Sequence, residues 1–174
     1  GIGYRNIFAQ KGYEADDLIA SLCQHTLAGQ RVTIVSGDND LWQLLSKLVS
    51  QYNPNHRKVT TRDSFVREWG IEPGQWAQVK AIAGCDTDDV PGVRGVAAAT
   101  AAKYLRGEVK RKSLTHRKIQ DEEEIIERNL GLVKLPYAGT KICTLREDEV
   151  TEEGWQVVCA ELGFRKINPF NRKQ

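Results

Sequence analysis

The sequence predicts an α/β fold with a parallel sheet, and three adjacent segments support this prediction. Residues 14–29 carry apolar side chains at the spacing of an amphipathic helix, and Gly29 stands where such a helix commonly ends. Residues 31–36, RVTIVS, are a short β-branched run typical of a strand that is buried on both faces. Helical spacing resumes in residues 38–45. A helix, a buried strand and another helix within about 30 residues indicate a layered α/β unit.

The elements that follow are each predicted from a local pattern. Residues 48–53 and 58–61 flank a turn-rich segment and indicate a β-hairpin. Gly70 ends one expected helix, Pro73 opens the next, and Thr151 is the expected N-cap of the last. The helices expected after the hairpin span residues 61–70, 73–83, 97–107, 121–132 and 151–163.

Composition limits the class of protein. The chain has 174 residues, of which 40% are hydrophobic and 28% charged, so it can bury a core and is not predominantly disordered. No run approaches the roughly 18 apolar residues of a membrane span. The four cysteines are widely separated, with no Cys-x-x-Cys pair, which argues against a zinc ribbon. We therefore expect a soluble, cytoplasmic protein that does not bind membranes.

Acidic residues are grouped at three places in the chain, in residues 14–17, 37–40 and 86–89. Each group has a purely structural explanation. Acids in the first turn of a helix complement its dipole, and Asp38 fits the N-cap of the following helix. However, the first two groups both stand where strands end and helices begin, and ligands of open α/β sheets collect at such positions.

Carboxylates gathered in this way favour a divalent-metal site. Crowded carboxylates repel one another and need compensating cations. Hard oxygen ligands without histidine or thiolate indicate Mg²⁺ or Mn²⁺ rather than zinc. One or two such ions are expected, and a pair of ions about 4 Å apart is the common arrangement for hydrolysing a phosphodiester.

The amino-acid composition changes near residue 84, where an acidic segment and then a Pro- and Gly-rich segment begin, and we place a domain boundary there. Residues 90–96, VPGVRGV, predict a tight glycine turn that leads into an alanine-rich helix. Glycines and a helix N-terminus suit a phosphate, and the basic run at residues 110–112 suits a nucleic-acid backbone. An ordinary helical hairpin with a solvated basic loop explains the same residues without any ligand.

Three motifs together resemble the 5′ nucleases, namely the 5′–3′ exonuclease domain of bacterial DNA polymerase I, phage 5′ exonucleases and flap endonucleases. The motifs are GYEADD (12–17), SGDND (36–40) and AGCDTDDVPGVRGV (83–96), and their order and spacing match the family. The resemblance covers about residues 1–135, and the similarity to the family is weaker in residues 128–136. It implies a partial Rossmann-like (PIN-type) parallel sheet in residues 1–83. A helix-hairpin-helix-type DNA-binding subdomain with terminal helices would occupy residues 84–174.

The resemblance also implies roles for individual residues. The expected catalytic carboxylates, which would also hold Mg²⁺ or Mn²⁺, are Glu14, Asp16, Asp38, Asp40 and Asp88. Asp17 adjoins them as a further metal ligand, and Asp86 is a weaker one. Backbone carbonyls of Val93 and Val96 would hold K⁺ at the hairpin. The expected DNA contacts are Gly92, Arg94, Gly95, Thr100, Lys103, Lys110, Arg111 and Lys112.

Three features depart from the family pattern. Cys85 stands where bacterial members carry an additional Asp. Ala97 and Ala99 replace a Gly and the Lys of the usual Gly-Ile-Gly-x-Lys-Thr hairpin. Family members also carry a first strand with a catalytic Asp and a basic helical arch before the EADD motif. The chain is therefore expected to be the carboxyl-terminal part of such a nuclease, completed by an amino-terminal segment or a partner chain.

The expected function is metal-dependent hydrolysis of DNA, as a 5′–3′ exonuclease or flap endonuclease of phage or bacterial replication and repair. The expected substrates are 5′ flaps, nicked or 5′-ended duplexes and RNA–DNA hybrids. The alternative is a non-catalytic module that binds DNA structure and leaves the chemistry to a partner. A carboxylate-cluster phosphatase of small molecules is a third hypothesis, which leaves the glycine hairpin unexplained.

Overall fold

The computed structural model describes residues 2–85, 89–164 and 170. It divides into two compact units, Gln10–Ile142 and a unit formed by Gly1–Ala9 with Cys143–Gln174, and each is described by itself. The sequence-based boundary between residues 83 and 84 falls inside the first unit and stays a prediction. No helix in the described part of the chain is long and apolar enough to cross a membrane.

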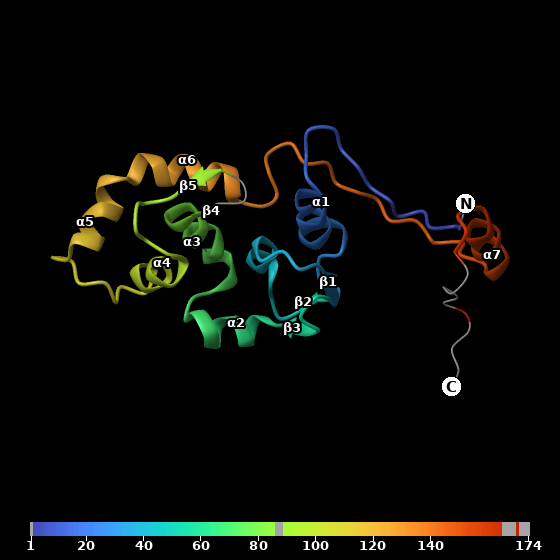
Figure 1. Ribbon diagram of the computed structural model, residues 1–174, viewed down its shortest axis with the longest axis horizontal. Coiled ribbons are helices and arrows are strands. Elements are labelled where there is room, and N and C mark those ends of the chain that lie inside the picture. Colours follow the sequence, from blue (N-terminus) through green and yellow to red (C-terminus); the bar gives the residue numbers. More distant parts are fainter. Residues whose placement is uncertain (1, 86–88, 165–169, 171–174) are drawn as a thin grey trace. The chain divides into compact units, whose positions relative to one another are not determined.

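The larger unit contains a three-stranded sheet in the order β1-β2-β3 (Figure 1). β1 (Val32–Val35) pairs in parallel with β2 (Val49–Asn53), with Val32 opposite Val49. β2 pairs antiparallel with β3 (Lys58–Thr60), with Gln51 opposite Thr60. The predicted α/β class, the parallel strand pair and the hairpin are all confirmed. Because β1 and β2 are parallel, both strands end at the same edge of the sheet.

The prediction that the first strand is buried on both faces is wrong. Ile34 is buried, but its neighbour Val35 is 66% exposed. Ile34 packs in a core cluster with Ala20, Leu41 and Leu44, and that cluster covers one face of β1. Because successive side chains of a strand point to opposite faces and only one face of β1 is covered, Ile34 lies in the core while Thr33 and Val35 are exposed. A β-branched run has the same appearance whether one face or both are covered.

Short helices flank this strand. α1 (Ala15–Ser21) continues directly into a π-helical turn, η1 (Leu22–Thr26), so the predicted helix is present with a wider last turn. A capping box between Glu14 and Asp17 begins α1. The helical pattern after β1 forms a 3₁₀ helix, η2 (Asp40–Leu44).

An aromatic core joins η2 to the next helices. α2 (Arg62–Trp69) begins with a capping box at Thr61 and ends at Gly70 with φ 67°, as expected. η3 (Pro73–Gln75) and α3 (Trp76–Ala83) follow. The rings of Trp42, Phe65, Trp69 and Trp76 contact one another, with the centroids of Trp69 and Trp76 4.7 Å apart.

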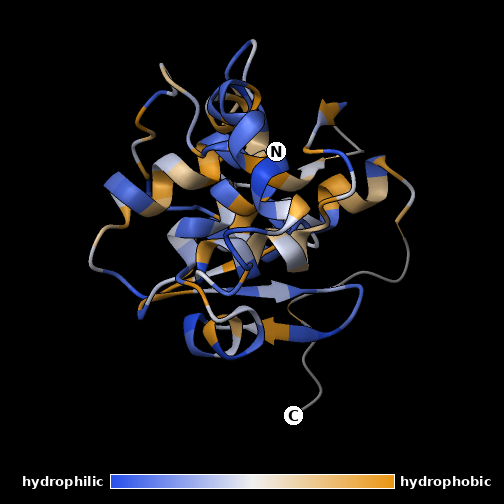
Figure 2. Cartoon of the chain, turned by 90° about the vertical axis from the view of Figure 1, so that its left-hand side faces the viewer, coloured by the Kyte–Doolittle hydropathy of each residue, from blue (hydrophilic) through white to orange (hydrophobic). Residues whose placement is uncertain are grey.

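The remaining elements of the larger unit pack around α3. β4 (Gly84–Cys85) and β5 (Val90–Pro91) form a small antiparallel pair. α4 (Ala98–Leu105), α5 (Leu114–Asp121) and α6 (Glu123–Val133) follow, and α3 packs against both α4 and α6 (Figure 1). Figure 2 shows hydrophilic and hydrophobic residues alternating along the helices, as expected when one face of a helix packs into a core.

The smaller unit combines the two ends of the described chain. The backbone N–H of Arg5 donates to Asp148 Oδ1 at 2.7 Å, and Asn6 exchanges hydrogen bonds with the backbone of Arg146. The helix α7 (Glu152–Glu161) begins at Thr151, whose hydroxyl accepts the N–H of Gly154 at 3.1 Å. The expected N-cap and last helix are therefore confirmed.

Candidate active site: a carboxylate cluster

The turn after β1 is held by a buried amide from the neighbouring strand. Gln51 on β2 is 2% exposed, and its Nε2 donates to the carbonyl oxygens of Ser36 at 2.9 Å and Asp38 at 2.6 Å. A single side chain thus fixes the backbone on both sides of Gly37. Gln51 was not singled out from the sequence, because its role depends on the pairing of β1 with β2.

The same turn positions two of the predicted carboxylates. Asp38 Oδ1 accepts the backbone N–H of Asp40 at 2.8 Å, and the N–H of Asp38 donates to Ser36 Oγ at 3.1 Å. The structural explanation of Asp38 is therefore partly right, since its carboxylate supports the start of η2. Asn39, however, is the N-cap residue of η2.

The first two acidic groups lie close together, as the pKa of Asp16 indicates. Burial and the nearby charge of Asp38 raise the pKa of Asp16 to about 6. A side-chain hydrogen bond with Asp38 and the charges of Asp40 and Glu14 act in the same direction. Four predicted site residues from α1 and the Ser36–Asp40 turn thus lie close enough to affect one another.

Asp17 has a different environment from its neighbours. It is 6% exposed, and its Oδ1 accepts the backbone N–H of Tyr137 at 2.7 Å. Its Oδ2 accepts the N–H of Glu14 at 3.2 Å. Oδ1 therefore holds α1 to the segment after α6, and Oδ2 caps the start of α1. A role for Asp17 as a metal ligand stays a prediction, and this geometry does not favour it.

The side chain of Lys80 on α3 contacts one of these carboxylates. Lys80 Nζ lies 2.7 Å from Asp40 Oδ1 and 3.5 Å from Cys85 Sγ. Burial acts to lower the pKa of Lys80, but the hydrogen bond and charge of Asp40, with smaller effects of Cys85, raise it above its ordinary value. Lys80 was not singled out from the sequence, because it is a single basic residue on the apolar helix α3.

Glu14, Asp16 and Asp40 line a cavity of about 340 Å³, whereas Asp38 is not part of its lining. Its polar lining comes mainly from carboxylates, and its other walls come from apolar residues near the end of α6 and from β5. The lining includes Glu14, Asp16, Asp40, Val90, Val133 and Tyr137. A half-enclosed, negatively charged cavity of this kind suits a hydrated divalent cation.

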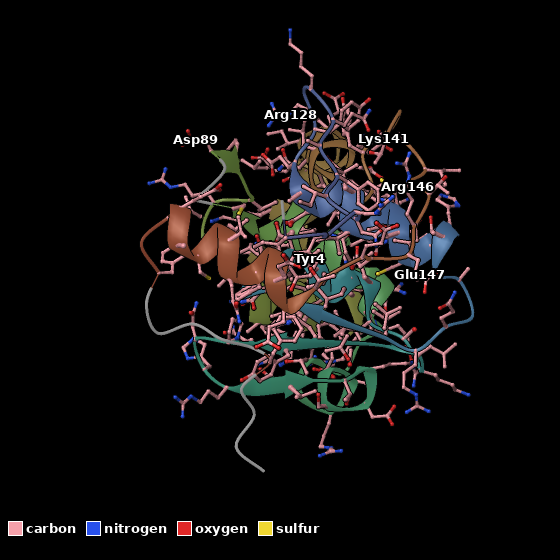
Figure 3. The ribbon with its side chains drawn as sticks, turned by 90° about the vertical axis from the view of Figure 1, so that its right-hand side faces the viewer. Tyr4, Asp89, Arg128, Lys141, Arg146 and Glu147 are labelled. Atoms are coloured by element: carbon pink, nitrogen blue, oxygen red, sulfur yellow. The ribbon has the colours of Figure 1, made fainter. Side chains whose placement is uncertain are left out.

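The third acidic group is only partly described. Asp86 and Asp88, a weaker and a full predicted metal ligand, lie outside the described residues. Asp89 is described; it has φ 52° and precedes β5 (Figure 3). Among the residues that are described, no three His, Cys, Asp or Glu side chains form a group that could hold a metal ion. The all-oxygen donor set and the raised pKa of Asp16 nevertheless fit a hard divalent cation such as Mg²⁺ or Mn²⁺.

A buried asparagine holds the segment that carries the third group. Asn129 on α6 is fully buried, and its Nδ2 donates to Ala81 O at 3.1 Å and Pro91 O at 2.7 Å. Its neighbour Arg128, labelled in Figure 3, donates to Asn129 Oδ1 at 3.1 Å. These bonds connect α6 to α3 and β5, on both sides of the acidic residues.

The glycine turn has the tight geometry expected of it. Val93 and Val96 are both buried, and the carbonyl of Val93 accepts the N–H of Val96 at 3.0 Å across Gly95, which has φ 81°. Gly92 passes so close to Ala83 that a side chain would collide with its backbone. K⁺ binding by the carbonyls of Val93 and Val96 stays a prediction.

Most of the predicted DNA contacts are available to solvent. Arg94 and Gly95 are exposed in the turn, whereas Gly92 and Thr100 are partly buried. The other predicted contacts are also exposed, namely Lys103 on α4 and Lys110, Arg111 and Lys112 between α4 and α5. Their contact with DNA stays a prediction.

Comparison with solved structures identifies the fold as PIN-like. The phage T5 5′-exonuclease with bound divalent metal ions (zinc) matches with a TM-score of 0.64 and 26% identity, over 74% of this chain and 52% of that chain. The phage T5 flap endonuclease, solved in a pseudo-enzyme-product complex with DNA and metal ions, matches with a TM-score of 0.65 over the same shares.

Sequence relatives are 5′ nucleases and DNA polymerases. A 5′-3′ exonuclease of Aquifex aeolicus is 37% identical over 79% of this chain and 50% of its own length. A 5′-3′ exonuclease of Bacillus subtilis is 40% identical over 60% of this chain and 36% of its own length. DNA polymerase I of Mycobacterium leprae is 38% identical over 57% of this chain and 11% of its own length. The chain thus spans half or less of each of these relatives.

One expectation about which part of a 5′ nuclease this chain represents needs correction. Residues 4–70 match the family described as 5′-3′ exonuclease, N-terminal resolvase-like domain. The resemblance to 5′ nucleases is therefore supported, but the expectation that the chain is the carboxyl-terminal part of such a nuclease is wrong. That expectation rested on the segments found before the EADD motif in relatives, whereas the match itself falls on an N-terminal domain.

Proposed function

We propose that this chain carries the carboxylate site of a divalent-metal-dependent 5′ nuclease that hydrolyses DNA phosphodiesters at 5′ ends or branch points. The observation that supports the proposal most strongly is the meeting of Glu14, Asp16, Asp38 and Asp40 at the carboxyl edge of a parallel sheet. The relatives named as 5′-3′ exonucleases and the T5 nucleases solved with metal ions point to the same chemistry.

In this proposal the carboxylates bind Mg²⁺ or Mn²⁺, which supplies charge stabilisation and a more acidic bound water. Asp16, Asp38 and Asp40 would provide oxygen ligands, with Glu14 beside them and Asp88 as the ligand from the third group. Gln51 would keep Asp38 and Asp40 in position by holding the turn between them and β1. Asp16 must give up its proton for full ligation, so its raised pKa makes metal binding depend on pH.

The glycine turn and the basic residues after α4 would hold the DNA backbone. They contact phosphates without reading bases, which suits an enzyme that recognises the shape of a junction rather than its sequence. We assign 5′ flaps and nicked or 5′-ended duplexes as the substrates, with RNA–DNA hybrids as a further class, and K⁺ at the turn as a structural ion. The proposed compartment is the cytoplasm.

The test uses a labelled 5′-flap duplex, the purified chain and Mn²⁺. The parent should release the flap, and Asp38→Asn and Asp16→Asn should each slow cleavage by about 100-fold or more, because each removes a metal ligand. Asp63→Asn is the matched control, since Asp63 is an exposed acid on α2 and should leave the rate unchanged. Equal cleavage by all three variants would contradict the assignment of the site.

A non-catalytic, DNA-binding role is the second candidate, and one observation favours it. Cys85 is buried and contacts Lys80 Nζ at 3.5 Å, at a position where the resemblance to 5′ nucleases implies an acid. Flap binding that persists without cleavage in Mn²⁺ would support this role over catalysis.

A further inference from the structure

Lys80 forms an ion pair with Asp40, one of the carboxylates of the proposed site. Its Nζ is 2.7 Å from Asp40 Oδ1, and both side chains are 19% exposed. Ion pairs of two exposed groups contribute little, but this pair is mostly shielded from water and salt. The ammonium also contacts Cys85 Sγ at 3.5 Å on the adjoining strand β4.

We propose that Lys80 is an internal counter-ion that occupies part of the divalent-cation position at Asp40, so that Lys80 and a metal ion compete for this carboxylate. The proposal rests on the proposed function, because it concerns the same metal site. It makes a residue outside the carboxylate motifs a competitor of the metal ion.

The charge balance of the cluster is the first argument. Glu14, Asp16, Asp38 and Asp40 lie near one another, and so many unbalanced negative charges would repel. The Lys80 ammonium offsets this repulsion at Asp40 in the absence of metal. The carboxylates can therefore stay together in the cavity before a divalent ion arrives.

Geometry is the second argument. A hard divalent ion binds a carboxylate oxygen at about 2.0–2.1 Å, closer than the ammonium does. An ammonium at hydrogen-bond distance from the same oxygen would face the metal as a like charge within a few ångströms. Because both cations cannot keep Asp40 Oδ1 at these distances without strong repulsion, metal binding requires Lys80 to withdraw.

The third argument is that Lys80 has a place to withdraw to. The helix α3 that carries it is fixed in the core through the buried residues Trp76 and Val79, so only the flexible side chain needs to move. The contact with Cys85 shows that the ammonium already reaches β4. A side-chain shift in that direction would release Asp40 while α3 stays in place.

The test measures Mn²⁺ binding in the absence of DNA, by titration calorimetry and by the electron paramagnetic resonance signal of free Mn²⁺. Lys80→Met keeps the length of the side chain and removes its charge. We expect Kd for Mn²⁺ to fall by about 10-fold or more, an order of magnitude suited to a shielded charge at contact distance. The gain should persist in 0.5 M NaCl, because salt screens this pair poorly.

Two variants separate competition from a general effect of charge. Lys80→Arg keeps a cation at Asp40 and should bind Mn²⁺ within about threefold of the parent, since the competing charge remains. Lys47→Met removes an exposed lysine elsewhere in the same unit, and its small effect should disappear in 0.5 M NaCl.

A second measurement covers the case in which Lys80→Met does not fold. In the parent, the side-chain ammonium resonance of Lys80 is followed by nitrogen-detected NMR during a Mg²⁺ titration. The resonance should shift or broaden as the ion pair with Asp40 breaks. A resonance that stays unchanged at saturating Mg²⁺ would overturn the proposal.

The outcomes distinguish this inference from the proposed function. If the parent binds Mn²⁺ and Lys80→Met binds equally or more weakly, Lys80 only supports Asp40, and the inference is wrong while the metal site stands. If only Lys80→Met binds Mn²⁺, competition is supported in its strongest form. If the parent, Lys80→Met and Asp40→Asn all fail to bind, the metal site and the inference are both wrong.

Discussion

The proposed site depends on a few individual residues: the carboxylates themselves, and the side chains of Gln51 and Lys80 that contact Asp38 and Asp40. Asp16, Asp38 and Asp40 were singled out from the sequence because they stand in acidic groups, one at the start of a helix and one directly after a strand. Gln51 and Lys80 were not, because an isolated glutamine or lysine carries no signal until strand pairing and helix packing place it. The roles of Asp86 and Asp88 stay predictions, since both lie outside the described residues.

Asp16 gives a pH dependence of known sign. In the folded chain the pKa of Asp16 is about 6, whereas the ordinary pKa of an aspartate is 3.8. The folded state therefore binds more protons between these values, and the free energy of unfolding contributed by Asp16 falls as pH rises through this window. Discounted for partial exposure, the loss should be about 1–2 kcal/mol.

The measurement is the melting temperature of the metal-free parent and of Asp16→Asn at pH 4.5 and pH 7. The difference between the two proteins isolates Asp16 from other titrating groups. The parent should lose stability relative to Asp16→Asn as the pH rises. A constant difference across this range would show that the Asp16 carboxyl is not held near Asp38 and Asp40.

Gln51→Leu tests how the turn is held. The substitution keeps a buried side chain of similar size but leaves the carbonyls of Ser36 and Asp38 without their donor. We expect a loss of about 1–3 kcal/mol in the free energy of unfolding, measured by urea denaturation, and weaker Mn²⁺ binding. Gln120→Leu changes an exposed glutamine on α5 and serves as the control. Unchanged stability and Mn²⁺ affinity in Gln51→Leu would rule out the positioning role.

For helices and strands, local sequence patterns predicted which structure a segment forms better than they predicted how far that segment is buried. The hairpin of β2 and β3, the helix ended by Gly70 and the helix begun by Thr151 were all predicted, because turn and capping residues act within a few positions. The burial of β1 was mispredicted, because it depends on which distant elements cover each face. The π-helical turn after α1 likewise had no local signal that separated it from an α-helix.

The backbone near Gly84 and Gly92 is too close to its neighbours to accept a side chain. A Cβ at Gly92 would collide with the backbone of Ala83 at the end of α3. Gly92→Ala should therefore cost more than about 2 kcal/mol in the free energy of unfolding, because backbone must shift to make room.

Two glycines with open surroundings provide matched controls in the same denaturation experiment. Gly74→Ala on η3 should be nearly neutral, and Gly131→Ala inside α6 should stabilise the chain by up to about 1 kcal/mol, because alanine favours a helix. If Gly92→Ala behaved like Gly74→Ala, the close approach of the two segments would be wrong.

At the scale of the whole molecule, the unit Gln10–Ile142 carries every described residue of the proposed site and of the proposed DNA contacts. The sequence predicted these two kinds of residue as belonging to separate domains. Asn129 connects α6 to α3 and to β5 by buried hydrogen bonds, and Trp42, close after Asp40, packs against the same core cluster as Val93 and Val96 of the glycine turn. Contacts of this kind join residues far apart in sequence and could not be predicted from local pattern. The boundary between residues 83 and 84 stays a prediction.

Salt dependence tests whether the basic residues of this unit meet phosphates. The double variant Lys110→Ala with Arg111→Ala should weaken binding of a 5′-flap duplex and reduce the slope of log K against log salt by about 1–2. The double variant Arg31→Ala with Lys47→Ala removes the same charge from exposed positions elsewhere and should leave the slope nearly unchanged. A slope unaffected by the first variant would assign the basic run to solvated surface.

The most direct measurement is the anomalous scattering of Mn²⁺ in a crystal of this chain. If the carboxylates form one divalent-metal site, a strong peak should lie at about 2.0–2.3 Å from oxygens of Asp16, Asp38 or Asp40 and should disappear in Asp38→Asn. A fully occupied Mn²⁺ peak elsewhere, with these three carboxylates making no contact to metal, would contradict the nuclease site described for this chain.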